Sequence, residues 1–141
     1  MTARTIDLPA STADASIAAA VGRFMIAAIF LLSGFGKLAD PAGTIAYISS
    51  AGLPLPQLAY ATAVAVELLG GALLVIGYRT RIAAWALAIF TVAAAFGFHL
   101  QFADQNQFLH FFKNLAMAGG LLQIAAFGAG ALSVDGHVAR R

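Results

Sequence analysis

The chain has 141 residues, of which 61% are hydrophobic and 10% are charged, and its formal net charge is +2. Soluble domains are about half apolar and a quarter charged, so this composition cannot cover a water-soluble surface and indicates an integral membrane protein. The basic residues are few and scattered, which argues against a nucleic-acid partner. The absence of cysteine excludes disulfides, thiolate metal sites and thiol redox chemistry by the chain itself.

The N-terminal segment, residues 1–16, is polar, and the first apolar stretch begins only at Ile17. That stretch contains Arg23, and no small-residue cleavage site follows it, so we interpret it as a retained spanning helix rather than a signal peptide. We therefore expect a cytoplasmic segment over residues 1–16, a transmembrane domain over residues 17–135 and a cytoplasmic tail over residues 136–141.

Four apolar stretches are long enough to cross a bilayer. About 20 residues at roughly 1.5 Å rise per residue match a hydrocarbon core about 30 Å thick. Lipid offers no partners to backbone groups, and none of the stretches alternates as a barrel strand would, so all are predicted to be helices. The stretches cover approximately Ile17–Leu38, Leu58–Gly77, Ile82–Leu100 and Lys113–Leu132.

The connections predict how these helices are arranged. The very short turn GYRTR makes the second and third helices antiparallel neighbours, and the double glycines Gly70-Gly71 and Gly119-Gly120 favour close helix packing. The predicted fold is therefore an all-α, antiparallel four-helix membrane bundle.

A short additional helix is predicted between the first and second spans. Asp40 is a suitable N-cap, Pro41 suits the first helical position, and Gly52 suits the left-handed position that ends a helix. Tyr47 and its apolar neighbours then favour a helix lying at the membrane surface.

The distribution of lysine and arginine predicts the orientation of the four spans. One side of the membrane receives Arg4, Arg79, Arg81, Arg140 and Arg141, and the other receives only Lys37 and Lys113. Because positive residues accumulate on the cytoplasmic side, both termini are expected in the cytoplasm.

Glu67 lies near the middle of the second span, where a charge costs about 3 kcal/mol or more. One interpretation is a buried ion pair with Arg23 that fixes how the first helix meets the second. The other is a proton-accepting or substrate-facing carboxylate in a cavity, and the two interpretations are compatible.

Several polar residues gather at the outer ends of the spans. The intervening segment QFADQNQFLHFF (residues 101–112) has four phenylalanines, which indicates a loop along the headgroups with His110 in its wet part. The outer cluster could form the mouth of a pocket for an anionic or quinone-like ligand, or each residue could simply anchor a helix end. No metal-ligand spacing is present. The candidate ligand-binding residues are Glu67, His99, Asn114, Lys113 and Lys37.

The ordered set of motifs resembles the DoxX family of small four-helix bacterial membrane proteins. An arginine early in the first span is followed by FLLSGFGKL, GLPLP, ELLGGALLVIGYRTRIAA, a histidine closing the third span, FFKNLAMAGGLL and GAGALSVD. The resemblance covers Arg23 to Asp135. By position, the family's recurring polar residues fall on Arg23, Lys37, Glu67, His99, Lys113 and Asn114.

The resemblance implies a location in the bacterial inner membrane and a link to redox chemistry. The family takes its name from a membrane subunit associated with thiosulfate:quinone oxidoreductase, and other relatives are linked to oxidoreductase complexes and oxidative-stress defence. The leading hypothesis is thus an accessory subunit, not catalytic alone, that binds a quinone or another lipophile or anchors a soluble or membrane redox partner. The alternatives are a proton-coupled carrier of small solutes acting as a homo-oligomer, and a scaffold that recruits a soluble enzyme.

Overall fold

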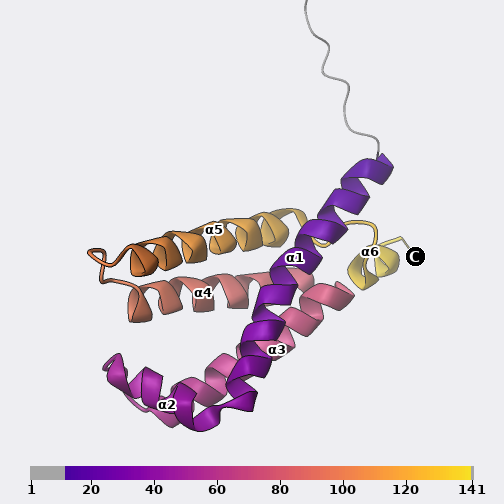
Figure 1. Ribbon diagram of the computed structural model, residues 1–141. Coiled ribbons are helices and arrows are strands. Elements are labelled where there is room, and N and C mark those ends of the chain that lie inside the picture. The colour runs from indigo at the N-terminus through magenta and orange to yellow at the C-terminus, as the bar shows by residue number, and fades with distance from the viewer. Residues whose placement is uncertain (1–11, 141) are drawn as a thin grey trace, which may run out of the picture.

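The computed structural model describes residues 12–140, and every regular element within that range is an α-helix (Figure 1). The all-α class is confirmed. The helices are α1 (Thr12–Ala39), α2 (Pro41–Ser50), α3 (Pro56–Ile76), α4 (Thr80–Phe98), α5 (Gln105–Phe127) and α6 (Val134–Val138). Residues 1–11 and 141, which include Arg4 and Arg141 of the charge argument, lie outside the described part.

Three of the helices in the described range, α1, α3 and α4, are long and apolar enough to cross a membrane. The chain is therefore a multi-pass membrane protein. In each, side chains such as Leu32, Leu69 and Ile89 are more than 60% exposed, which places large apolar groups where lipid would surround them.

The short helix expected after the first span is present as α2. The Asp40 side chain caps it by accepting a hydrogen bond from the backbone N–H of Gly43 at 2.9 Å, and Pro41 occupies its first turn. Gly52 follows the helix with φ +75°, the left-handed conformation that favours glycine. Ile48 is buried, and the Tyr47 ring stacks on Phe98 of α4 at 5.4 Å, so α2 packs back onto the other helices.

The bounds predicted for the last long helix, Lys113–Leu132, were wrong: α5 runs from Gln105 to Phe127. Its start is set by Asp104, whose carboxylate accepts hydrogen bonds from the backbone N–H groups of Asn106 and Gln107. A good N-cap outweighs the loop-like polar composition, so most of the expected headgroup loop is the first part of a helix. At the other end, Gly128 adopts φ +86° and stops the helix before Leu132.

Close contacts at glycine hold α1, α3 and α4 together. A Cβ on Gly34 of α1 would lie 2.6 Å from Cδ2 of Leu68 on α3. In the double glycine of α3, Gly71 faces Leu31 of α1 and Gly70 faces Leu87 of α4. The expectation of close packing is confirmed here. Figure 1 shows α4 and α5 as an antiparallel hairpin that diverges from the α1–α3 pair toward the α2 end.

At the opposite end, α6 binds the turn between α3 and α4. The Asp135 carboxylate accepts hydrogen bonds from the backbone N–H groups of Arg79 and Thr80 at 2.9 and 2.8 Å, and its own N–H donates to the Gly77 carbonyl at 2.9 Å. A residue from the C-terminal helix therefore caps α4. Residues 136–138, expected in a tail, belong to this helix.

Replacing Gly34 tests the packing of α1 on α3. We expect Gly34→Val to lower the free energy of unfolding by about 1–3 kcal/mol, because the new side chain would displace Leu68. Gly36→Val is the matched control, since a Cβ on Gly36 meets no atom within 4 Å. Unfolding in mixed micelles provides the measurement, and equal losses in both variants would contradict the packing argument.

Acid should weaken the α6 contact. Burial acts to raise the pKa of the Asp135 carboxyl, but hydrogen bonds from Thr80 and Arg79 and the charge of Arg23 together hold that pKa below its ordinary value. A carboxylate with a depressed pKa stabilises the folded state fully at pH values above its unfolded-state pKa of about 3.9. This stabilisation is lost as the pH falls through the folded-state pKa.

Asp135→Ala should accordingly cost about 1 kcal/mol at pH 7 through loss of the cap. The difference from the wild type should shrink as thermal unfolding in micelles is followed from pH 5 to pH 3. A difference that stays constant over this range would show that the carboxylate charge is irrelevant to the contact.

Candidate functional site

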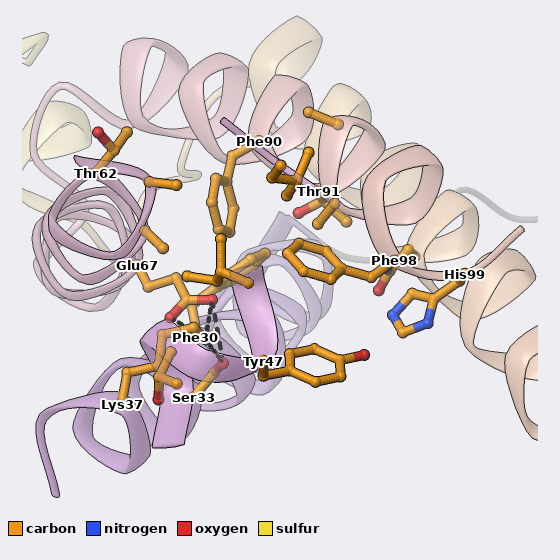
Figure 2. Close-up of a pocket in the computed structure, with 18 of the residues that line it drawn as sticks. Phe30, Ser33, Lys37, Tyr47, Thr62, Glu67, Phe90, Thr91, Phe98 and His99 are labelled. Atoms are coloured by element: carbon orange, nitrogen blue, oxygen red, sulfur yellow. Dashed lines mark hydrogen bonds and ion pairs between the residues drawn. The ribbon is translucent and has the colours of Figure 1, made fainter. Parts of the chain in front are cut away.

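A cavity of about 650 Å³ lies between α1, α2 and α3 on one side and α4 and α5 on the other (Figure 2). Its walls are mainly apolar and include the aromatic rings of Phe30, Tyr47, Phe90 and Phe98. The cavity occupies the end at which the α4–α5 hairpin and the α1–α3 pair diverge. It is also lined by all the candidate ligand-binding residues of the sequence: Lys37, Glu67, His99, Lys113 and Asn114.

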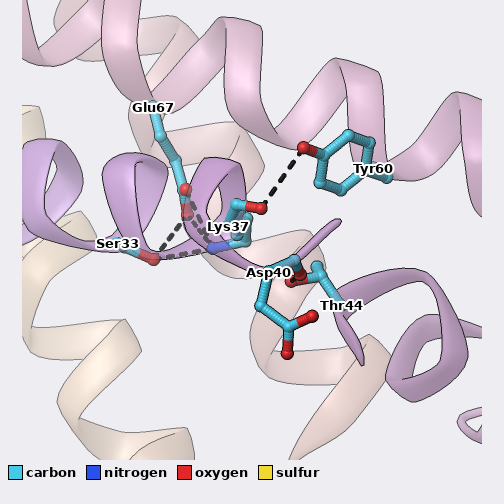
Figure 3. A network of polar contacts seen from close by, with 6 residues as sticks. All are labelled: Ser33, Lys37, Asp40, Thr44, Tyr60 and Glu67. Atoms are coloured by element: carbon cyan, nitrogen blue, oxygen red, sulfur yellow. Dashed lines mark hydrogen bonds and ion pairs between the residues drawn. The ribbon is translucent and has the colours of Figure 1, made fainter. Parts of the chain in front are cut away.

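A buried ion pair forms one wall of the cavity. Nζ of Lys37 lies 3.0 and 2.9 Å from Oε1 and Oε2 of Glu67, and it donates to Oγ of Ser33 at 2.7 Å (Figure 3). The Ser33 hydroxyl in turn donates to Oε1 of Glu67 at 3.1 Å. The side chain of Glu67 is 6% exposed and that of Lys37 is 23% exposed. Each charge is thus compensated within the cluster.

The helices place these groups for simple geometric reasons. Ser33 and Lys37 lie one helical turn apart on the same face of α1. The close approach at Gly34, next to Ser33, brings this face against Glu67 of α3. The Tyr60 hydroxyl of α3 donates to the Lys37 carbonyl at 3.2 Å and holds the end of α1 against the start of α3.

The expected ion pair between Arg23 and Glu67 was wrong. Arg23 is 2% exposed and donates from Nη1 to the Ala129 carbonyl at 3.0 Å and from Nη2 to the Leu132 carbonyl at 2.9 Å. Its guanidinium also contacts the backbone at Gly77. Because α1 and α3 are antiparallel, this point is roughly three turns and 15 Å from Glu67 along α3. Arg23 therefore belongs to the end of the molecule that holds α6.

The mouth of the cavity is formed where α4 ends and α5 begins. His99 follows α4, and its Nδ1 lies 2.6 Å from Oε1 of Gln107 on α5. The His110 ring stacks on His99 with centroids 5.2 Å apart, and His110 also lines the cavity. Its expected place in a loop was therefore wrong, because this segment is helical. Between residues 12 and 140, no group of His, Asp and Glu side chains is arranged to hold a metal ion.

Sequence reasoning missed four polar residues of the cavity, namely Ser33, Thr44, Thr62 and Thr91. Ser33 lies one helical turn from Lys37, so a sequence-based pairing of Lys37 with Glu67 would have placed Ser33 beside the carboxylate as well. Thr91 of α4 is 3% exposed, and its Oγ1 is buried without a hydrogen-bond partner among the described residues. A threonine within an apolar helix gives no signal of this kind, because its hydroxyl usually bonds to the preceding turn.

A double-mutant cycle tests which basic residue pairs with Glu67. Glu67→Ala alone should lower the free energy of unfolding by about 1–3 kcal/mol, because the partly buried Lys37 ammonium loses its counter-charge. Combined with Lys37→Met, the loss should be smaller than the sum of the two single losses, with a coupling of about 1–3 kcal/mol.

Arg23 provides the matched control for this cycle. Its replacement by methionine should add to Glu67→Ala within about 0.5 kcal/mol, since the two sites share no partner. Coupling of Glu67 to Arg23 rather than to Lys37 in unfolding experiments would refute the arrangement described.

Comparison with known proteins identifies relatives and a family for this chain. Two inner membrane proteins of Escherichia coli (strain K12) are similar over 82% of this chain. YqjF is 37% identical over 118 residues and 87% of its own length, and YphA is 33% identical over 120 residues and 86% of its own length. No solved structure matches the chain significantly. The DoxX family model matches residues 18–100, which contain α2, α3, α4 and most of α1. The chain therefore belongs to the DoxX family.

Proposed function

We propose that the cavity binds a small lipophilic molecule with a polar head, of the quinone class, and that the protein serves as an accessory subunit of a membrane-associated redox or oxidative-stress system. The observation that carries this proposal is the cavity itself. Its volume of about 650 Å³ suits a small organic ligand, and its mainly apolar walls contain a few converging polar groups.

The rim of the cavity supports a ligand that arrives from the membrane. Leu55 and Leu58 line the cavity and are 67% and 61% exposed, so apolar side chains join its interior to the lipid-facing surface. Four aromatic side chains on the walls offer flat surfaces for a ring. A water-soluble metabolite would gain little from such a lining.

The accessory role rests on what the chain can do chemically. It has no cysteine and so no thiol that could accept electrons from a bound hydroquinone, and we assign that acceptor role to another protein. The Lys37–Glu67 pair and His99 are suited to orienting a head group and exchanging protons with it. Binding is thus the proposed task of this chain, and electron transfer is assigned to a soluble or membrane-bound partner.

The proposed location is the bacterial inner membrane, in line with the names of the two relatives. Among the described residues, Arg79, Arg81 and Arg140 lie at the α6 end, whereas Lys37 and Lys113 lie at the cavity end. The positive-inside rule then places the α6 end in the cytoplasm and opens the cavity toward the periplasm. In this arrangement α5, paired antiparallel with α4, would be the fourth span.

A proton-coupled carrier is the second candidate, because Glu67 is an acid at mid-helix within a cavity. Such a carrier would produce a pH-dependent solute flux in proteoliposomes, and Glu67→Gln would abolish it. The ligand-binding proposal expects no flux above that of empty vesicles.

Filling the cavity tests the proposed function. Ala94 lines the cavity, and Ala94→Phe should weaken binding of decylubiquinone and its reduced form by roughly tenfold or more. Ala86→Phe is the matched control, since Ala86 lies on the exposed face of the same helix. Native mass spectrometry of protein released from micelles measures the bound fraction. If neither form is retained by the wild type, or if both variants behave alike, the proposal fails.

A further inference from the structure

The Thr91 hydroxyl is the one group on the described cavity walls that is fully buried yet has no hydrogen-bond partner. A buried hydroxyl left unbonded costs about 1–3 kcal/mol, so such groups are uncommon in folded proteins. The neighbouring helical turn offers a carbonyl, but no bond to it forms. A partner supplied by a ligand would account for this hydroxyl.

Thr91 and Glu67 lie at the same level on neighbouring antiparallel helices. Gly70 of α3 faces Leu87 of α4. Thr91 lies one turn after Leu87 in the sequence, and Glu67 lies one turn before Gly70. Because α3 and α4 are antiparallel, both steps lead from the Gly70–Leu87 contact toward the same end of the molecule. Both side chains are buried and line the same cavity (Figure 2). At this end the α4–α5 hairpin diverges from the α1–α3 pair (Figure 1), and the cavity of about 650 Å³ between them provides the space for a head group.

The Lys37–Glu67–Ser33 cluster has used its donors but not all its acceptors. The three N–H groups of Lys37 match three contacts, to Oγ of Ser33 and to both oxygens of Glu67. The Ser33 hydroxyl donates to Oε1 of Glu67. A carboxylate accepts about four hydrogen bonds, so one site remains, on Oε2. The cluster is also electrically neutral as a whole.

We propose that the ligand has a neutral head group carrying an O–H or N–H donor, which donates to Oε2 of Glu67 while Thr91 bonds its other side. This inference rests on the proposed function and narrows it. An anionic head would meet a carboxylate whose charge is already balanced. An oxidised quinone head has only acceptors, so it could accept from the Thr91 hydroxyl but could not bond to Oε2 of Glu67, whereas a hydroquinone head can bond to both. Within the quinone class, the site therefore selects the hydroquinone form.

A matched pair of air-stable probes tests the donor. 4-Nonylphenol and 4-nonylanisole share the same ring and tail, but only the phenol carries an O–H. Native mass spectrometry of the full chain in micelles should show the wild type binding the phenol roughly tenfold more tightly than the methyl ether, as expected for one hydrogen bond to a charged group.

Thr91 variants test the other side of the head group. Thr91→Val has nearly the same shape and should lower affinity for the phenol about fivefold or more, and Thr91→Ser should restore most of it. Thr91→Val removes an unbonded buried hydroxyl, so without ligand it should unfold at the same temperature as the wild type or a higher one, and a loss of affinity cannot then be a loss of folding. An unchanged affinity for the phenol in Thr91→Val would overturn the role of Thr91.

The outcomes separate this inference from the proposed function. Equal affinity of the wild type for the phenol and the methyl ether would overturn the donor requirement and leave lipophile binding intact. Tighter binding of decylubiquinone than of decylubiquinol would overturn it as well. Failure of all four molecules to bind would refute both proposals together.

Discussion

The ion pair between Lys37 and Glu67 is the constraint around which this end of the molecule is organised. A carboxylate at mid-helix in an apolar chain is tolerated only with a partner at short range and with its remaining oxygens bonded. Lys37 and Ser33 supply both, and they reach Glu67 because α1 lacks a side chain at Gly34 and so approaches α3 closely. The glycine contact, the ion pair and the polar wall of the cavity therefore depend on one another.

The two ends of the molecule use buried charge differently. At the α6 end, Arg23 donates to two backbone carbonyls and Asp135 accepts from two backbone amides, so the charges tie chain segments together. At the cavity end, the Lys37–Glu67 pair lines the same cavity as Thr91, whose hydroxyl is unbonded. Among the described residues, unbonded buried polar atoms occur at both ends, at Nε of Arg23 and Oγ1 of Thr80 as well as at Thr91, so what distinguishes the ends is the cavity beside Glu67. This contrast directs the functional proposals to Glu67 rather than to Arg23.

Much of the fold could be predicted because its signals are local. The three membrane-competent helices follow from apolar length, and α2 follows from Asp40, Pro41 and Gly52. The partner of Glu67 could not be predicted, since counting residues along two helices gives only approximate depth. The true register depends on Gly34 meeting Leu68 and Gly71 meeting Leu31, which are contacts between helices. The start of α5 was missed because Asp104, the residue that caps it, stands in a polar and aromatic segment whose composition is typical of a loop.

The predicted partner of Glu67, Arg23, was wrong, yet all the candidate ligand-binding residues line one cavity. The register of the helices explains both results. Lys37, His99 and Lys113 were grouped because they end or begin apolar stretches on one side of the membrane, and that grouping needs only topology. Glu67 lies with these residues because the long side chain of Lys37, near the end of α1, is directed inward to the carboxylate rather than outward to the headgroups. Here the nearest buried carboxylate outweighs the headgroup region as a destination for the Lys37 ammonium. A cation that the sequence favours as an anchor at the membrane surface thus becomes part of the cavity wall, and the cavity acquires a polar wall without net charge. That neutrality, combined with the spare acceptor on Glu67, is what makes an uncharged donor the best match for the site.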